Sequence, residues 1–148
     1  MSKVFKAVFA AILIAAMLFC ALFALGVVGF HNVYEVEDME DPFGDLFTGT
    51  ILDGEFNGTG RIVYENGDIY EGNFRAGDYT GPGVFTSTFG WRYEGGFKNG
   101  LPEGNGMFID QNGGVFKGMF AAGAITGEGV FTKPDGWSYE GSWSAGRQ

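Results

Sequence analysis

Apolar and polar side chains alternate with a period of two through most of the chain after residue 46. The segment 91–98 reads WRYEGGFK, and its aromatic residues fall on every second position. The segment 83–86, GVFT, alternates in the same way, with glycine and phenylalanine on one face. A period of two is typical of a β-strand that has one apolar and one polar face. The pattern therefore predicts a series of short strands that each bury one side.

The strands recur in units of 23 residues. The unit YEGNFRAGDYTGPGVFTSTFGWR reproduces the spacing of aromatic residues and glycines found before and after it. Self-similarity at a fixed period predicts a repeat architecture, with units at 47–69, 70–92, 93–115 and 116–138 and a partial unit at 139–148. The recurring structural positions are Tyr70, Gly72, Phe74, Tyr93, Gly95, Phe97, Phe116, Gly118, Phe120, Tyr139, Gly141 and Trp143.

Turn-forming residues separate the strands. Asn-Gly and Asp-Gly pairs stand between the second strand of one unit and the first strand of the next, at 65–68, 111–114 and 133–136. Such pairs supply the positive φ angles of a tight hairpin. Within a unit, glycines such as Gly81 are expected to shape the loop that returns the chain. Each unit should therefore contribute two strands to a series of hairpins.

Gly72 and its equivalents lie between two aromatic residues on one strand face, where glycine costs about 0.5–1 kcal/mol relative to alanine. Interior strand glycines often mark a close approach of other atoms to the backbone. We therefore expect aromatic rings from the neighbouring strand to lie across these glycines. A single hairpin is not stable in water, whereas hairpins in series form a continuous sheet whose aromatic face is covered unit by unit.

The spacing Y-x-G-x-F-x-x-G-x-x-x-G-x-G, followed seven residues later by another glycine, resembles the MORN (membrane occupation and recognition nexus) repeat. The resemblance covers residues 47–148. It implies an all-β repeat fold, an elongated single-layer antiparallel sheet of consecutive hairpins, in a scaffold, membrane-associated adaptor or targeting module. The loop between the glycines is commonly basic in the family but reads DYT, LPE and AIT in successive units here. The chain thus departs from the family's pattern for capturing anionic lipid head groups.

Residues Val8 to Phe30 form an apolar run without a charge. As a helix this run would be about 35 Å long, which is enough to cross the core of a bilayer. A cleavable signal peptide is the alternative, but its apolar region normally spans about 7–15 residues and ends at a small-x-small site. We therefore expect residues 1–30 to be a retained transmembrane helix through which the protein contacts the membrane.

The charges that flank this run predict its orientation. Lys3 and Lys6 precede it, and acidic residues follow it. Because basic flanks stay in the cytoplasm, the N-terminus should be cytoplasmic and the repeats should lie on the non-cytoplasmic side of a single-pass protein. Cleavage of the segment as a signal would instead give a secreted protein.

Residues 31–46, HNVYEVEDMEDPFGDL, contain six acidic residues and show no clear period of 2 or 3.6. A Pro-Phe-Gly breaker and the like charges predict an extended, self-repelling acidic linker. Clustered carboxylates raise the possibility of a calcium site, but the spacing of acids and glycine in a calcium-binding loop is missing. His31 is the only histidine, and at the membrane boundary it is expected to be an interfacial residue.

The formal net charge is −9. We expect no nucleic-acid partner, because binding to a polyanion requires clustered lysine and arginine, and the chain has no such cluster. Cys20 is the only cysteine, so an intrachain disulfide is impossible. The sequence has no Ser-His or Cys-His pair, no metal-spaced cluster and no phosphate-binding loop that leads into a helix. We therefore expect no enzymatic activity, no cofactor and no bound metal.

Trp91 and Trp137 share one position of the unit, which other units fill with Asp68 and Gly114. Unit-specific tryptophans are good candidates for partner contacts, and Tyr79 in the glycine loop is a third candidate. A purely structural role for these three residues is the competing interpretation.

The leading functional hypothesis is a membrane-anchored, non-enzymatic scaffold for protein–protein interaction. An unidentified protein would bind the aromatic face or add a strand to a free sheet edge, and that edge could also pair with a second copy of the chain. The alternatives are a module that stacks its exposed tryptophans on a glycan or cell-wall ligand, and a module that binds a lipid surface.

Overall fold

The computed structural model describes residues 32–144, which belong to a compact unit that begins at Asn32. The anchor expected at Val8 to Phe30 and His31 lie outside these residues. Within residues 32–144, no helix has the length and apolar character that a bilayer crossing requires.

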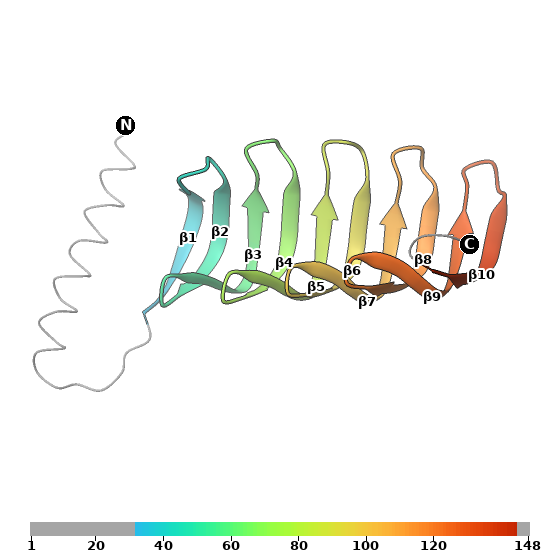
Figure 1. Ribbon diagram of the computed structural model, residues 1–148. Coiled ribbons are helices and arrows are strands. Elements are labelled where there is room, and N and C mark those ends of the chain that lie inside the picture. The colour runs from blue at the N-terminus through green and yellow to red at the C-terminus, as the bar shows by residue number, and fades with distance from the viewer. Residues whose placement is uncertain (1–31, 145–148) are drawn as a thin grey trace, which may run out of the picture. The chain divides into compact units, whose positions relative to one another are not determined.

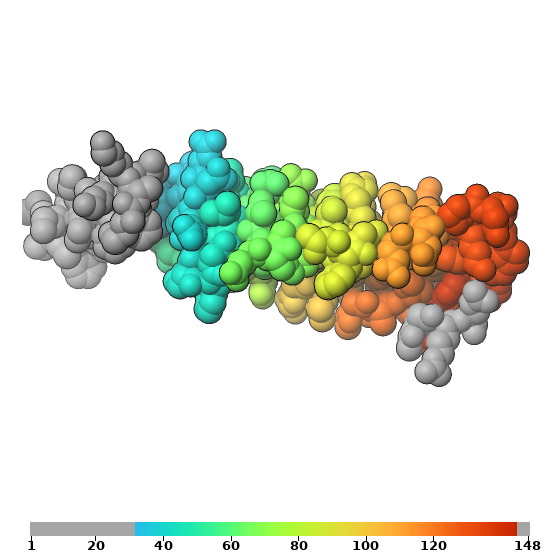
Figure 2. Space-filling model, turned by 90° about the horizontal axis from the view of Figure 1, so that it is seen from above, coloured from blue at the N-terminus to red at the C-terminus, as the bar shows by residue number. Residues whose placement is uncertain are grey.

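Ten strands form one antiparallel sheet in which each strand pairs with its neighbours in the chain (Figure 1). The strands are β1 (Val33–Glu40), β2 (Leu46–Leu52), β3 (Glu55–Val63), β4 (Ile69–Arg75), β5 (Asp78–Thr86), β6 (Arg92–Lys98), β7 (Leu101–Ile109), β8 (Val115–Ala121), β9 (Ala124–Thr132) and β10 (Ser138–Trp143). Successive units follow one another along a single direction (Figure 2). The predicted all-β repeat, a single antiparallel sheet of consecutive hairpins, is confirmed.

Each hairpin within a unit carries a bulge at the same position of the repeat. In β4–β5, Gly72 pairs with Gly83, but the next residue, Asn73, pairs with Thr80, so β5 has two extra residues. The first of them, Gly81, has a φ of 60°, which glycine adopts without a steric cost. Gly81 therefore shapes a bulge inside a strand and not the expected loop. Bulges bend a strand and increase its twist.

The bulges divide the sheet into two parts. Between the bulge and the loops that join successive units, the strands stand upright, and we call this part the upper wing. Between the bulge and the turn within each unit, the strands swing forward (Figure 1), and we call this part the lower wing. The sheet is thus a single layer that is folded along the line of bulges.

The two kinds of turn are distributed differently from the sequence expectation. The two-residue turns in which both residues have positive φ lie within units, at Asp53-Gly54, Ala76-Gly77, Asn99-Gly100 and Ala122-Gly123. In the loops between units, only the glycine has a positive φ. Gly67 is an example, and its N–H donates a hydrogen bond to the Tyr64 carbonyl at 2.8 Å. The Asn-Gly pair at 66–67 therefore belongs to a three-residue loop and not to a tight two-residue turn.

Replacement of Ala122 by asparagine should stabilise the sheet. Ala122 has a φ of 45°, a conformation that costs an alanine about 1–2 kcal/mol and that asparagine tolerates better. Asn99 occupies the same position one unit earlier. We expect Ala122→Asn to raise the free energy of unfolding by about 0.5–1 kcal/mol in denaturant titrations of the full chain in detergent. Ala121→Asn, in the regular strand β8, is the control, and equal effects of the two changes would contradict the assignment.

The expectation that residues 31–46 form a linker is wrong, because most of this segment belongs to the sheet. β1 pairs antiparallel with β2, with Tyr34 opposite Ile51 and Met39 opposite Phe47. Met39 also packs against the buried core. Without β1, the apolar side chains of the first unit would be exposed on the side away from the second unit. Burial of that apolar surface offsets the cost of bringing the acidic strand into the sheet.

An irregular register explains why the sequence pattern did not predict β1. The register shifts between Val36 and Met39, and Asp38 has a φ of 47°, so no period of two runs through the strand. The loop that follows β1 did leave a signal, since Gly44 lies 23 residues before Gly67 and marks the same turn.

The same features protect the edge of the sheet. The described sheet has two edge strands, β10 and β1, and β1 pairs with β2 alone. Its side chains Glu35, Glu37 and Asp38 are exposed. Charges and bulges on an edge strand disfavour pairing with another chain, so two β1 strands should repel each other.

Candidate functional site

An aromatic ring lies over a pair of glycines at the fold of each unit. A Cβ atom added to Gly72 would clash with Tyr70 Oη and lie 2.7 Å from the Gly83 Cα, and one added to Gly83 would lie 2.7 Å from Tyr70 Oη. The close approach expected from the sequence is therefore present. The ring over Gly72 comes from its own strand, two residues earlier, and the neighbouring strand supplies the ring only for Gly83.

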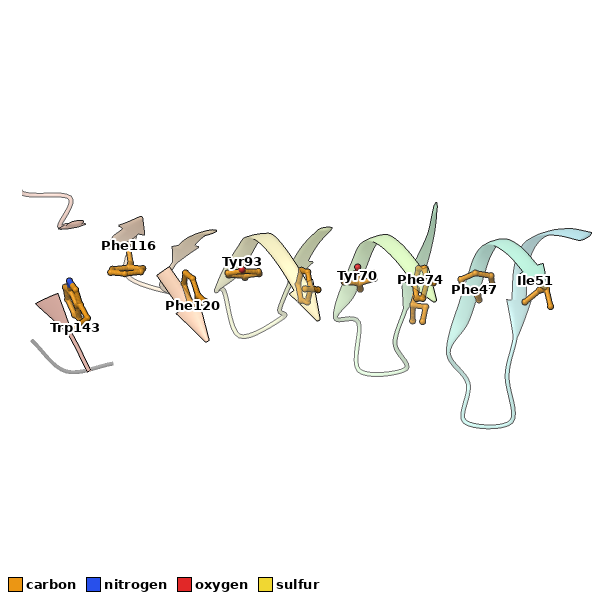
Figure 3. Packing of buried hydrophobic residues seen from close by; sticks show 10 residues of the cluster. Phe47, Ile51, Tyr70, Phe74, Tyr93, Phe116, Phe120 and Trp143 are labelled. Carbon is orange, nitrogen blue, oxygen red and sulfur yellow. The ribbon is translucent and has the colours of Figure 1, made fainter. Parts of the chain in front are cut away.

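The rings form one continuous row along the sheet (Figure 3). Tyr79 from the lower wing stacks on Tyr70 with a centroid distance of 3.6 Å and an interplanar angle of 12°. Phe74 and, from the next unit, Phe97 meet Tyr70 edge-on at 5.2 and 5.1 Å. The buried side chains of the row are Phe47, Ile51, Ile62, Tyr70, Phe74, Tyr93, Phe97, Phe116, Phe120 and Trp143, whereas Tyr139 is half-buried.

The Tyr70 hydroxyl completes the contact by donating a hydrogen bond to the Asn73 carbonyl at 3.0 Å. Tyr93 makes the equivalent bond to Gly96 at 2.9 Å. Because Tyr70 belongs to the upper wing and Tyr79 to the lower, the stacked rings also fix how far the two wings close toward each other. The same residues therefore set the bend of the sheet and line its concave side.

The two wings enclose a groove on the side that carries the rings. One hollow of this groove has a volume of about 180 Å³ and is lined by Tyr79, Phe85, Trp91, Tyr93, Phe97, Gly100 and Pro102. A second hollow of about 250 Å³ is lined by Phe56, Ile62, Tyr64, Gly77, Asp78, Tyr79 and Gly100. We number the hollows in chain order. The hollow lined by Tyr64 is the first hollow, and the hollow lined by Trp91 is the second hollow. They lie about one unit apart, which is about 9–10 Å because a unit spans two strand spacings.

The structure brings two of the three candidate binding residues together. Trp91 stacks with Phe85 at 5.1 Å and an angle of 11°, and it lines the second hollow with Tyr79. Trp137 lies two units further along the chain. It is 46% exposed, and the Lys133 Nζ lies 4.8 Å from the centre of its ring. Trp91 and Trp137 therefore do not form one site.

The candidate binding residues did not include three aromatic residues that line the groove, namely Phe56, Tyr64 and Phe85. Phe56 and Tyr64 line the first hollow together with Tyr79. The signal was available, because Tyr64 is specific to its unit: the equivalent positions hold Ser87, Asp110 and Lys133.

Aspartates tie the loops at the upper rim of the groove to one another. Asp68 Oδ1 accepts hydrogen bonds from the Thr88 N–H at 2.7 Å, the Thr88 hydroxyl at 3.0 Å and the Ser87 hydroxyl at 3.1 Å. These bonds, led by that from the Thr88 backbone, lower the pKa of Asp68. One unit earlier, Asp45 accepts from the Glu65 N–H at 2.9 Å. The first three loops of the upper rim are thus linked in series.

Burial and nearby negative charge raise the pKa of the groove tyrosines. The pKa of Tyr64 rises to about 12, first because of burial and then because of the Asp45 and Asp68 carboxylates. Burial also raises the pKa of Tyr70 to about 12. Ionised Tyr70 would place a charge among the rings and would lose the hydrogen bond that its hydroxyl donates.

Stability should therefore fall in alkaline solution. The folded-state pKa of Tyr70 lies above its ordinary value of 10.0, so its contribution is complete below pH 10 and is lost as the pH rises toward 12. For this one residue the loss amounts to about 2 kcal/mol. We expect Tyr70→Phe, which copies Phe47 and Phe116, to lose less stability than the natural chain between pH 9 and pH 11.5 in denaturant titrations. An equal loss in both proteins would contradict this account.

The outer face of the sheet is different in character. Arg61 pairs with Glu71 at 3.2 Å, and Arg92 pairs with Glu94 at 2.9 Å. These ion pairs are well exposed, and exposed pairs contribute little stability. Within residues 32–144, no group of three or more histidine, cysteine, aspartate or glutamate side chains is arranged to hold a metal ion.

Comparison with known protein families gives one match. A family model described as MORN repeat matches residues 47–69, 70–88, 93–115, 116–138 and 139–148, about two-thirds of the chain. The match to the second unit ends at Thr88, so Trp91 lies outside the matched segments. A search of curated proteins finds no match to the chain.

Proposed function

Because the chain belongs to the MORN repeat family, we propose that it is a non-enzymatic scaffold that binds a protein partner in the groove between its two wings. MORN repeats commonly mediate interactions with proteins or membranes. The observation that carries the proposal is the second hollow, where the unit-specific Trp91 and Tyr79 form apolar walls that remain partly open to solvent. Partly exposed aromatic residues in a concave site are typical anchors of protein interfaces.

Charge argues for a protein partner over a lipid surface. All 18 acidic residues lie within residues 32–144, against six of the nine basic residues. A surface with this negative balance repels anionic head groups. The sharing of the groove between units favours an extended or helical segment that crosses more than one unit.

We also propose that Val8 to Phe30 anchors the protein in a membrane as a single pass. Its charge-free apolar length and the basic flank at Lys3 and Lys6 support a cytoplasmic N-terminus and repeats on the opposite side. A C-terminal topology reporter tests this, and activity of a reporter that works only in the cytoplasm would refute the orientation. An N-terminal sequence that begins after residue 20 in the mature protein would indicate secretion after cleavage instead.

Affinity capture with the tagged full chain from detergent extracts tests the scaffold function. We expect Trp91→Ala to weaken capture of the partner about 30-fold, as for a central anchor residue worth about 2 kcal/mol. Thr86→Ala, on the exposed outer face of β5, is the matched control and should leave capture unchanged. The proposal fails if no captured protein depends on the repeats, or if Thr86→Ala weakens capture as much as Trp91→Ala.

A glycan ligand remains the second candidate because the indole of Trp137 is 46% exposed. Sugar rings stack on exposed tryptophan faces, and the full chain in detergent can be applied to a glycan array. Binding that is lost in Trp137→Ala would favour this function, and blank binding would remove it.

A further inference from the structure

The first hollow has a composition that no other unit shares. Three aromatic residues, Phe56, Tyr64 and Tyr79, line a space of about 250 Å³. One unit later, the positions of Tyr64 and Tyr79 hold Ser87 and Pro102. Because the repeat fold persists without these rings, the fold itself does not require them at this place.

The rings are held in position by the row of buried aromatics. Phe56 stacks on Phe47 with a centroid distance of 3.7 Å and an angle of 17°, and Tyr79 stacks on Tyr70 in the same way. Tyr64 lies 6.2 Å from Phe85 on the upper wing. Phe56 and Tyr79 are therefore fixed by a stacked ring behind them, and all three rings remain partly exposed.

Negative charge surrounds this end of the groove. The segment 32–60 contains eight acidic residues and no basic residue. Asp78 lines the first hollow, with Arg75 opposite it in the register, and the carboxylates of Asp45 and Asp68 act on Tyr64 from the upper rim. These four groups have a net charge of −2, so the hollow lies in a negative field.

The last complete unit, 116–138, contains its own cation at the corresponding place. Lys133, at the position equivalent to Tyr64, holds its Nζ 4.8 Å from the ring centre of Trp137, at the position equivalent to Asp68. The upper wing thus accommodates a cation–π contact where the sequence supplies a lysine. In the first unit, these two positions hold a ring, Tyr64, and a carboxylate, Asp68.

We propose that the first hollow binds the cationic side chain of a lysine or arginine from the protein partner. This inference rests on the proposed scaffold function and specifies the chemistry of the partner. Aromatic rings attract a cation through their negative faces, and the surrounding carboxylates add charge complementarity. A lysine or arginine also has an apolar stem, which suits a hollow whose walls are mostly hydrocarbon.

The second hollow predicts a second feature of the partner, an apolar residue at a fixed distance from the basic one. This hollow is apolar and lies about 9–10 Å from the first, two strand spacings along the sheet. A helix places residues i and i+7 about 10.5 Å apart, and a polyproline II segment places residues i and i+3 about 9.3 Å apart. The partner segment therefore carries a basic residue and an apolar residue at one of these spacings.

The test uses the full chain in a nonionic detergent that has no ammonium head group. The probe is Nα-acetyl-lysine methylamide, compared with its isostere in which a methyl group replaces the ammonium, and binding is followed by NMR of the probe. We expect saturable upfield shifts of the lysine ε-CH₂ protons and at least about five-fold weaker binding of the isostere, as one cation–π contact provides. Tyr64→Ser should abolish this preference, and Tyr64→Phe, which keeps a ring, should retain it.

Tyr139→Ser, the same change at the far end of the sheet, is the matched control and should bind the probe like the natural chain. Circular dichroism melting verifies that each variant is folded. The proposal is overturned if neither probe binds, if both probes bind equally, or if the preference survives in Tyr64→Ser. Partner capture that depends on Trp91 but not on Tyr64 would leave the scaffold function standing and refute this inference alone.

Discussion

Gly72→Ala is expected to destabilise the sheet by about 3 kcal/mol, although alanine in a strand interior is ordinarily better than glycine by about 0.5–1 kcal/mol. The new Cβ would clash with Tyr70 Oη and would lie 2.7 Å from the Gly83 Cα. Tyr70 cannot move aside, because Tyr79 covers its other face and Phe74 and Phe97 meet its edges. The backbones of the two strands would have to separate.

The repeat supplies a matched control for this change. Gly141 occupies the same position in β10, but the three atoms nearest to a Cβ there all belong to the Tyr139 side chain, with its hydroxyl at 2.6 Å. Tyr139 is half-buried and lies at the edge of the sheet, so it can shift. Gly141→Ala should therefore cost less than about 1 kcal/mol. Equal free energies of unfolding for the two variants in denaturant titrations would contradict the role assigned to the ring.

Tyr70→Ala should cost about 3–5 kcal/mol, the range for removal of a buried aromatic side chain. The side chain is 0% exposed, and its ring contacts both wings of its own unit and Phe97 of the next. Units of a repeat protein are stabilised mainly by their neighbours, so the loss should also weaken the coupling between units.

Denaturant titration of the full chain tests this expectation. We expect the midpoint to fall and the transition to broaden, because the units on either side of Tyr70 would no longer unfold together. Tyr139→Ala removes the equivalent, half-buried ring at the edge and should cost about 1–2 kcal/mol. A Tyr70→Ala protein that unfolds in one transition with the natural midpoint would contradict the account.

The period of 23 residues was sufficient to predict the part of the sheet from β2 onward. Alternation predicted the strands, and the position of Gly72 between two aromatic residues predicted rings in contact with backbone. These features are local, since each depends on residues close in sequence or on a position that repeats.

The bend of the sheet could not be predicted in this way. It follows from the register of β4 and β5, in which Gly72 pairs with Gly83 and Asn73 with Thr80, so that the two residues after Thr80 have no partner in β4. Register is a property of two strands together. The same limitation explains the turns: Ala76 and Ala122 adopt positive φ, which their residue type disfavours, because the paired strands on both sides leave room for only two residues.

The first strand was missed for a different reason. Its acidic residues and its irregularity at Val36 to Met39 removed the alternation that marks the other strands. The prediction of a partner site was limited likewise, since it compared repeat positions one at a time and could not show which residues of different strands lie together. The structure shows that Trp91 is part of a groove and that Trp137 is not beside it, whereas Tyr64, Phe56 and Tyr79 share a hollow.

The central claim is that the scaffold binds its partner in the groove between the wings. Photo-crosslinking in intact cells tests it most directly, with a photoreactive amino acid placed either at Pro102, on the groove wall, or at Thr86, on the outer face. We predict that the chain labelled at Pro102 forms a crosslinked product with a distinct protein and that the chain labelled at Thr86 does not. A product formed at Thr86 and absent at Pro102 would contradict the claim.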